Sequence, residues 1–135
     1  MYCLDTDVIS ALLRPEPQLE PIRRLARIPA DEQHTTAITA GELLYGALRR
    51  GSERVRTTVE AFLASAITIL PFDTAAAAEY ARIRSELETG GRRLADPDLR
   101  IAAIALSRDL TIVTGNVRHF QRVPGLRVEN WLAEA

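Results

Sequence analysis

Four oxygen-bearing side chains are placed so that they can meet although they lie far apart along the chain. Asp5 follows a short apolar strand, Glu42 and Asp98 each lie near the start of a helical segment, and Asn116 follows another apolar strand. Carboxylates held close together repel one another and do not all stay ionised without a cation. A hard divalent ion such as Mg²⁺ or Mn²⁺ relieves that repulsion. The pattern predicts a metal site with Asp5, Glu42 and Asp98 as ligands and Asn116 beside them.

Attack of water on a phosphodiester is the chemistry that such a site serves best. A divalent ion lowers the pKa of water and neutralises charge that builds on phosphate. The net charge of -1 gives no overall attraction to nucleic acid, so contacts must come from local patches. The candidates are Arg49, Arg50, Arg54, Arg56, Arg92 and Arg93. A solvated face is the simpler explanation of any one pair taken alone, but together these side chains predict a grip on a phosphate backbone.

The elements that must position these residues alternate along the chain. Apolar or β-branched runs predict strands at 2–4, 34–38, 67–70 and 110–114, with a short fifth at 127–128. Helical spacing predicts helices at about 8–13, 22–27, 39–50, 53–65, 74–88 and 96–107. Strands separated by helices imply right-handed crossovers and a parallel sheet. Because the carboxyl ends of parallel strands share one edge, the four side chains are expected to converge there.

Each acidic residue also has a structural explanation. Asp5 fits the N-cap of the first helix, which does not exclude metal binding. Glu42 lies three residues after Thr39, which fits a capping box as well as an active site. Asp96, directly before a proline, is the expected N-cap of its helix, which leaves Asp98 in the first turn with its side chain available.

Composition limits the class of protein. A chain of 135 residues with 47% apolar residues predicts one globular domain over residues 1–135. No apolar window long enough for a membrane span and no leader peptide are found, so we expect a cytoplasmic protein without a membrane partner. The single cysteine, Cys3, is interpreted as a small buried hydrophobe. The absence of lysine excludes Schiff-base enzymes and P-loop nucleotidases.

Four short segments follow one another in an order shared by a known family. They read LDTDVI at 4–9, TAGELLYGA at 39–47, DLRIAA at 98–103, and TGNVRHF at 114–120 with VPGL at 123–126. These segments are similar to LDTNVI, T-x-x-E-L-x-x-G-A, D-L-x-I-A-A and T-N-N-x-x-x-F with V-P-G-L in the PIN-domain ribonucleases, specifically the VapC toxins of type II toxin-antitoxin pairs. The resemblance covers nearly the whole chain.

The resemblance implies roles for matching positions. Asp5, Glu42 and Asp98 would be the acidic metal-site residues, and Asn116 would fill a fourth position where other PIN domains often carry Asp. Two further residues, Thr6 and Thr114, would line the site.

Two departures from the family pattern affect the site. Asp7 stands where the family usually has Asn, which adds a negative charge and a further ligand or outer-shell group. Gly115 replaces another common Asn, which is expected to loosen its loop.

The family also implies an architecture, an activity and partners. We expect an α/β/α sandwich with a central parallel sheet of four to five strands, and a Mg²⁺-dependent endoribonuclease acting on structured RNA such as tRNA or rRNA, with Mn²⁺ as the alternative ion. A homodimer, an inhibitory VapB-like antitoxin, and a heterotetramer or larger complex with that antitoxin are the expected assemblies.

Two other functions compete with this prediction. The segment Asp5-Thr6-Asp7-Val8-Ile9 also resembles the nucleophile motif of haloacid-dehalogenase-type phosphatases, but Ile9 does not fit that motif and the lysine of those enzymes is missing. A catalytically silent PIN-like module that binds RNA or a protein is the second alternative. Clustered carboxylates argue against it, because they cost stability without a metal.

Overall fold

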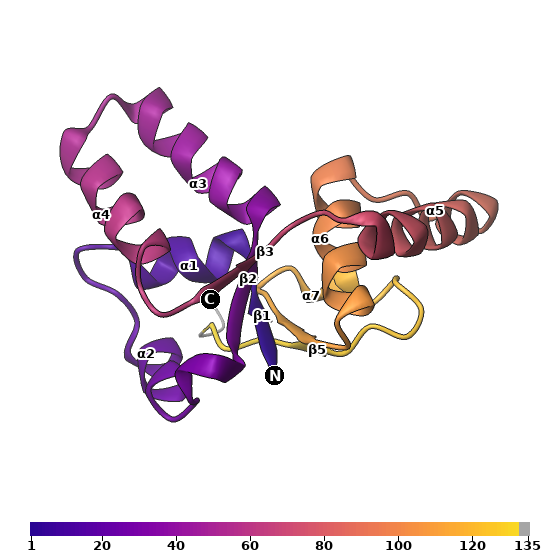
Figure 1. Cartoon of the computed structure of the whole chain (residues 1–135), viewed down its shortest axis with the longest axis horizontal. Coiled ribbons are helices and arrows are strands. Elements are labelled where there is room, and N and C mark those ends of the chain that lie inside the picture. Colours follow the sequence, from indigo (N-terminus) through magenta and orange to yellow (C-terminus); the bar gives the residue numbers. More distant parts are fainter. Residues whose placement is uncertain (133–135) are drawn as a thin grey trace.

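The computed structural model describes residues 1–132, which form an α/β/α sandwich around a parallel sheet (Figure 1). The strands are β1 (Tyr2–Leu4), β2 (Gln33–Thr36), β3 (Thr68–Leu70), β4 (Thr111–Val113) and β5 (Val128–Glu129). Their order across the sheet is β3-β2-β1-β4-β5, and every neighbouring pair is parallel. The predicted fold class and strand number are therefore confirmed.

Helices make the crossovers that parallel strands require. They are α1 (Thr6–Leu12), α2 (Leu19–Ala26), α3 (Ala37–Arg50), α4 (Glu53–Leu63), α5 (Thr74–Thr89), α6 (Asp96–Ser107) and α7 (Val117–Phe120), with a 3₁₀ turn η1 at Ala30–Glu32. Figure 1 shows α1 to α4 on one side of the sheet and α5 to α7 on the other. The turn η1 and helix α7 were not predicted, because three or four residues are too few to show a periodic pattern.

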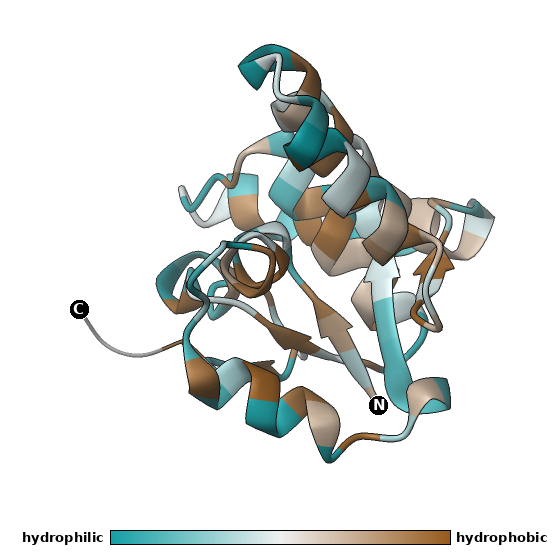
Figure 2. Ribbon diagram, turned by 90° about the vertical axis from the view of Figure 1, so that its left-hand side faces the viewer, coloured by the Kyte–Doolittle hydropathy of each residue, from teal (hydrophilic) through white to brown (hydrophobic). Residues whose placement is uncertain are grey.

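The core is divided by the sheet, because successive side chains of a strand point to opposite faces. Leu4 and Val113 pack with the buried residues of α1, α3 and α4, whereas Cys3 and Ile112 face α5 and α6. All four side chains are fully buried. In Figure 2 the polar strand β2 is teal beside strands that are mostly brown. Two apolar layers thus fix the sheet from both sides.

The predicted caps of two helices are wrong, and one of these helices, α3, begins two residues before its predicted start. Helix α3 is capped by Thr36, whose hydroxyl accepts a hydrogen bond from the backbone N–H of Thr39 at 3.0 Å. The predicted capping box between Thr39 and Glu42 therefore does not form, because β2 ends at Thr36 and the helix begins at once. Consequently Glu42 lies in the second turn, where its carboxylate is not needed as a cap.

Helix α6 has the predicted bounds, 96–107, but not the predicted cap. Its N-cap is Ala95, which makes no side-chain cap, and Asp96 is already helical. The Asp96 carboxylate accepts hydrogen bonds from Tyr80 on α5 and, at 2.6 Å, from Arg100 on α6. Asp96 is thus structural, as predicted, but through a contact to α5 and an ion pair within α6 rather than as a cap. None of the helices within residues 1–132 is long and apolar enough to cross a membrane.

Replacing Thr36 by Val should lower the free energy of unfolding by about 0.5–2 kcal/mol, the usual cost of losing an N-cap. Val keeps the shape of this fully buried side chain but cannot accept the hydrogen bond from Thr39. Chemical denaturation of the two proteins measures the difference. Thr36→Ser, which keeps the hydroxyl, is the control for the cap and should retain more stability than Thr36→Val; equal stability of the Val variant and the wild type would contradict the assignment.

Candidate active site

Asp5 lies at the carboxyl end of β1, the central strand, and caps α1. Its backbone N–H donates to the carbonyl of Val113 at 2.9 Å, which continues the pairing of β1 with β4. One carboxylate oxygen accepts from the N–H of Thr6 and the other from the hydroxyl of Thr114, both at 2.8 Å. The residue is only 5% exposed. Asp5 is therefore a fixed carboxylate at the centre of the sheet edge.

Asp7 reaches the same place from the first turn of α1. Its Oδ2 accepts a hydrogen bond from the backbone N–H of Gly115 at 2.9 Å. A Cβ at position 115 would lie 2.7 Å from that oxygen and 2.8 Å from a methyl carbon of Leu132. Instead of loosening the loop, Gly115 lets it approach Asp7 closely enough to bond.

Glu42 enters the site from α3 through a hydroxyl on α1. The Thr6 hydroxyl donates to Glu42 Oε1 at 2.6 Å and lies 3.3 Å from the hydroxyl of Thr39. Thr6 and Glu42 are 36 residues apart in sequence, so this contact joins two helices. The contact orients the exposed Glu42 side chain and holds its carboxylate beside Thr6, the residue that follows Asp5.

Asp98 approaches from the opposite layer, on the first turn of α6. Its carboxylate is partly buried and lies 3.8 Å from Nδ1 of His119, a residue of α7. The structure places the imidazole near a carboxylate of the candidate site, and the signal available in the sequence was its position three residues after Asn116.

Burial and mutual repulsion shift the pKa values of these acids. Burial raises the pKa of Asp5 to about 7; hydrogen bonds from Thr114 and Thr6 oppose the rise, and the charges of Asp7 and Asp98 add to it. Burial also raises the pKa of Asp98, against the effect of His119 and together with the charges of Glu42 and Asp7. The pKa of Asp7 is raised by burial as well. The four carboxylates therefore form one electrostatically coupled cluster, which we call the acidic cluster.

Two other candidate side chains lie beside the acidic cluster. Thr114 is fully buried at the end of β4, and its hydroxyl is 3.5 Å from Asp7 Oδ1 in addition to its bond with Asp5. The N–H of Asn116 donates to the Thr114 hydroxyl at 2.9 Å, while the Asn116 side chain is exposed and does not cap α7. Thr114 thus joins Asp5, Asp7 and Asn116 through one oxygen.

The six candidate arginines divide between two sides of the molecule. Arg50 and Arg54 line a pocket whose wall includes Thr6 and Glu42, whereas the exposed Arg49 and Arg56 do not line it. Arg92 and Arg93 border an open hollow beside the α5–α6 loop. Of the six, the structure therefore brings Arg50 and Arg54 to the pocket beside the acidic cluster.

The donor set fits a hard divalent cation. Every charged group of the acidic cluster offers carboxylate oxygen, and burial together with mutual repulsion disfavours the ionised forms of Asp5 and Asp98, a cost that a bound cation would offset. Within residues 1–132, no three Asp, Glu, His or Cys side chains are close enough to hold an ion by direct contact alone. This spacing suits Mg²⁺, which usually keeps several water ligands and takes only one or two carboxylates. The thiol of Cys3 offers no alternative chemistry, because burial raises its pKa to about 12.

Comparison with known proteins agrees with this geometry. The model of the PIN domain family matches residues 2–126. The chain belongs to the PIN domain family. The family resemblance that the four sequence segments carry is therefore confirmed.

Relatives of the chain within the PIN domain family are named as ribonucleases. The chain is 37% identical over 131 residues to the tRNA(fMet)-specific endonuclease VapC of Salmonella typhimurium, covering 96% of this chain and 97% of that protein. It is also 37% identical over 132 residues to ribonuclease VapC of Haemophilus influenzae, covering 97% and 98%.

Solved structures share the fold over the full length. The DNA-bound VapBC structure from Salmonella typhimurium has a chain that matches with a TM-score of 0.88 at 36% identity, covering 97% of this chain and 98% of that chain. A chain of FitAcB from Neisseria gonorrhoeae matches with a TM-score of 0.85 at 33% identity, covering 96% and 97%.

The raised pKa of Asp5 predicts how stability depends on pH in metal-free buffer. The Asp5 pKa is about 7 in the folded state against a usual 3.8, so the folded protein binds this proton more tightly than the unfolded chain. Its stabilising effect is fully present below about pH 4 and is lost as the pH rises through about 7, at up to about 1.4 kcal/mol per pH unit.

Urea unfolding in EDTA at several pH values checks this dependence. Asp5→Asn keeps an N-cap for α1 and removes the titrating group. The wild type should therefore lose stability relative to Asp5→Asn between pH 4 and 7. Parallel stability curves for the two proteins would contradict the predicted burial of charge.

Proposed function

We propose that this PIN-domain protein is a divalent-metal-dependent endoribonuclease of the VapC type, which hydrolyses phosphodiester bonds in structured RNA such as tRNA or rRNA. Mg²⁺ is the proposed ion and Mn²⁺ the alternative. The observation that carries the proposal is the convergence of Asp5, Glu42 and Asp98 from both layers on one edge of the sheet, with Asp7 among them.

Asp5, Glu42 and Asp98 are the proposed metal ligands: one or two of them would bind the cation directly and the rest through its water ligands, with Asp7 as a further ligand or outer-shell group. When bound, the cation supplies Lewis acidity: it lowers the pKa of water and neutralises charge on the phosphodiester. Thr114 and the N–H of Thr6 hold both Asp5 oxygens in place. The Thr6 hydroxyl directs Glu42. These bonds keep the carboxylates ready without reorganisation during the reaction.

Asn116 and His119 complete the proposed machinery at the end of β4 and in α7. Asn116 is fixed through its backbone to Thr114, and its exposed amide is available to orient water or a phosphate oxygen. His119 faces Asp98 at 3.8 Å, where its imidazole is placed to adjust the charge of that carboxylate. Both residues thus act at the open side of the acidic cluster.

The geometry disfavours the phosphatase alternative. Phosphatases of that class work with a lysine beside the aspartate nucleophile, and the chain has no lysine, while Glu42 is held toward the site by Thr6 without a role in that chemistry. A silent binding module is disfavoured because holding several partly buried carboxylates together raises the pKa values of Asp5 and Asp98 and costs stability. A protein that only binds RNA or another protein gains nothing from that cost, whereas a metal-dependent nuclease requires the cluster.

We further propose that residues 1–135 act as one PIN domain in the cytoplasm, paired with a VapB-like antitoxin. Structural relatives have been solved as VapBC and FitAB assemblies, including forms bound to DNA. By analogy, the chain is proposed to form a homodimer that joins two antitoxin chains in a heterotetramer or larger complex.

Loss of one proposed ligand should remove cleavage. Glu42→Gln and Asp98→Asn should each lower the rate of RNA cleavage at least about 100-fold, because charge stabilisation by a metal is worth several kcal/mol. Incubation of purified protein with total RNA in Mg²⁺ or EDTA, with sequencing of new 5′ ends, measures the rate and names the substrate.

Glu53→Gln is the matched control, because Glu53 is an exposed helical glutamate at the start of α4. It should cleave like the wild type. Thermal unfolding gives a second readout: Mg²⁺ should raise the melting temperature of the wild type and of Glu53→Gln more than that of Asp98→Asn. Full cleavage by Asp98→Asn, or cleavage in EDTA, would refute the proposed site.

The candidate arginines are proposed to hold the RNA backbone, with Arg92 and Arg93 on one side and Arg49 and Arg50 on the other. Arg92→Glu combined with Arg93→Glu should weaken RNA binding and flatten its dependence on salt, since fewer phosphates are neutralised. Fluorescence anisotropy at several salt concentrations measures both. Unchanged affinity in a folded variant would remove these two residues from the interface.

A further inference from the structure

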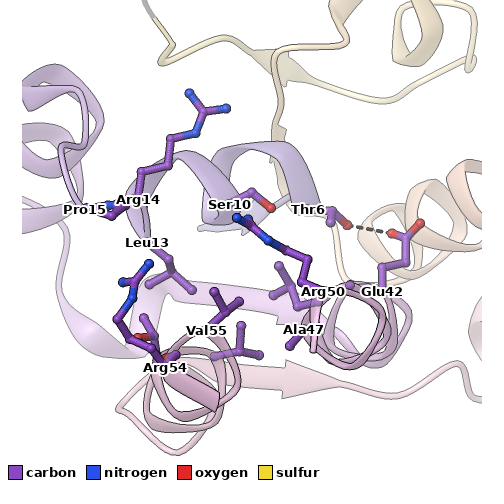
Figure 3. Close-up of a pocket in the computed structure, with 14 residues that line it drawn as sticks. Thr6, Ser10, Leu13, Arg14, Pro15, Glu42, Ala47, Arg50, Arg54 and Val55 are labelled. Carbon is purple, nitrogen blue, oxygen red and sulfur yellow. Dashed lines mark hydrogen bonds between the residues drawn. The ribbon is translucent and has the colours of Figure 1, made fainter. Parts of the chain in front are cut away.

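A pocket of about 300 Å³ opens beside the acidic cluster, between α1, α3 and α4 (Figure 3). Thr6 and Glu42, which are bonded to each other, form one end of it. Its floor is apolar and consists of Leu13, Leu43, Ala47, Val55 and Val59. The pocket is therefore continuous with the site where we propose that RNA is cut.

Arginine side chains supply the charge of this pocket. Arg14 after α1, Arg50 on α3 and Arg54 on α4 line it, and within residues 1–132 none of their guanidinium groups has an ion pair or a hydrogen bond. Arg56, two residues after Arg54 on α4, is instead held by Glu53 and Glu60. In Figure 3 the Arg50 side chain extends toward Ser10 and that of Arg54 rises toward Leu13, whereas that of Arg14 extends away from both. Three uncompensated guanidinium groups thus border the pocket, and Arg50 and Arg54 are the two beside its apolar floor.

We infer that this pocket holds one unpaired nucleotide of the RNA, next to the phosphate that is cleaved. A guanidinium fork matches the oxygens of a phosphate, and an apolar floor accepts the face of a base. The volume is at the lower end for small-ligand sites, so it suits a single nucleotide and not a base pair. Single-stranded loops offer such splayed bases, whereas a duplex does not.

The inference rests on the proposed ribonuclease function and narrows its substrate class to RNA with an unpaired nucleotide at the cut. The roles of the pocket residues follow from their positions. Arg50 and Arg54 bind phosphate, and Ser10, which also lines the pocket, adds a hydroxyl beside them. None of these residues is a proposed metal ligand, so they govern substrate binding rather than the chemical step.

The test compares two RNA probes in a protein that binds without cutting. In an Asp98→Asn background, Arg50→Gln with Arg54→Gln forms the pocket variant. Arg23→Gln with Arg27→Gln is the control, because these two exposed arginines of the α2 region also have no ion pair within the described residues. The probes are a fluorescent RNA hairpin with a loop of mixed sequence and a blunt RNA duplex of the same length, measured by anisotropy with Mg²⁺.

The pocket variant should bind the hairpin at least about tenfold more weakly than the control variant does, with a shallower salt dependence, and should bind the duplex like the control. In the background with Asp98 intact, the same pair of changes should raise KM more than it lowers kcat. Equal hairpin affinity of the pocket and control variants would overturn the inference. Retained hairpin affinity with lost binding of the cognate antitoxin would also overturn it and mark a protein-docking surface.

Failure of the broader proposal has a different signature. If the parent protein neither binds the hairpin nor cuts any RNA with Mg²⁺, the ribonuclease function fails and this inference with it. If the parent binds and cuts while the pocket variant matches the control, only the pocket assignment is lost.

Discussion

The structure depends on keeping a charged group buried at the end of its central strand. The Asp5 side chain is almost completely buried, yet its carboxylate accepts two hydrogen bonds, one from the start of α1 and one from the end of β4. These bonds require β1 and β4 to stay in register and α1 to begin at once after β1. The arrangement of three elements is therefore tied to the position of one side chain.

The sandwich brings further charges to Asp5 from both layers. Glu42 comes from the side of α1 to α4, and Asp98 comes from the side of α5 to α7. A parallel sheet makes this possible, because every crossover returns the chain to the same edge. The raised pKa of Asp5 reflects its burial first, and the charges of Asp7 and Asp98 add to it. Bringing these carboxylates together lowers the stability of the metal-free protein, and a cation bound among them would offset that loss.

Much of this could be predicted from the sequence. The strand at 2–4 is apolar and ends in Asp5, so both the parallel sheet and the location of the site followed from strand order. The cap of α3 could not be predicted, because Thr36 and Thr39 are chemically equivalent and only the end of β2 decides between them. The bond between Thr6 and Glu42 depends on how two helices pack, which local patterns do not encode. For the pocket a signal did exist: Arg50 follows Leu43 and Ala47 at helical spacing, so it continues their stripe, whereas Arg49 does not.

The close approach of Gly115 to Asp7 ties two positions together that lie 108 residues apart. The loop can reach the carboxylate only because residue 115 has no side chain, and the carboxylate in turn fills the space that a side chain would need. The two departures from the family pattern therefore meet in one contact, but they are not equally constrained. A side chain at position 115 would collide with the Asp7 carboxylate and with Leu132, whereas Asn at position 7 has the shape of Asp and an oxygen that can accept from the same N–H.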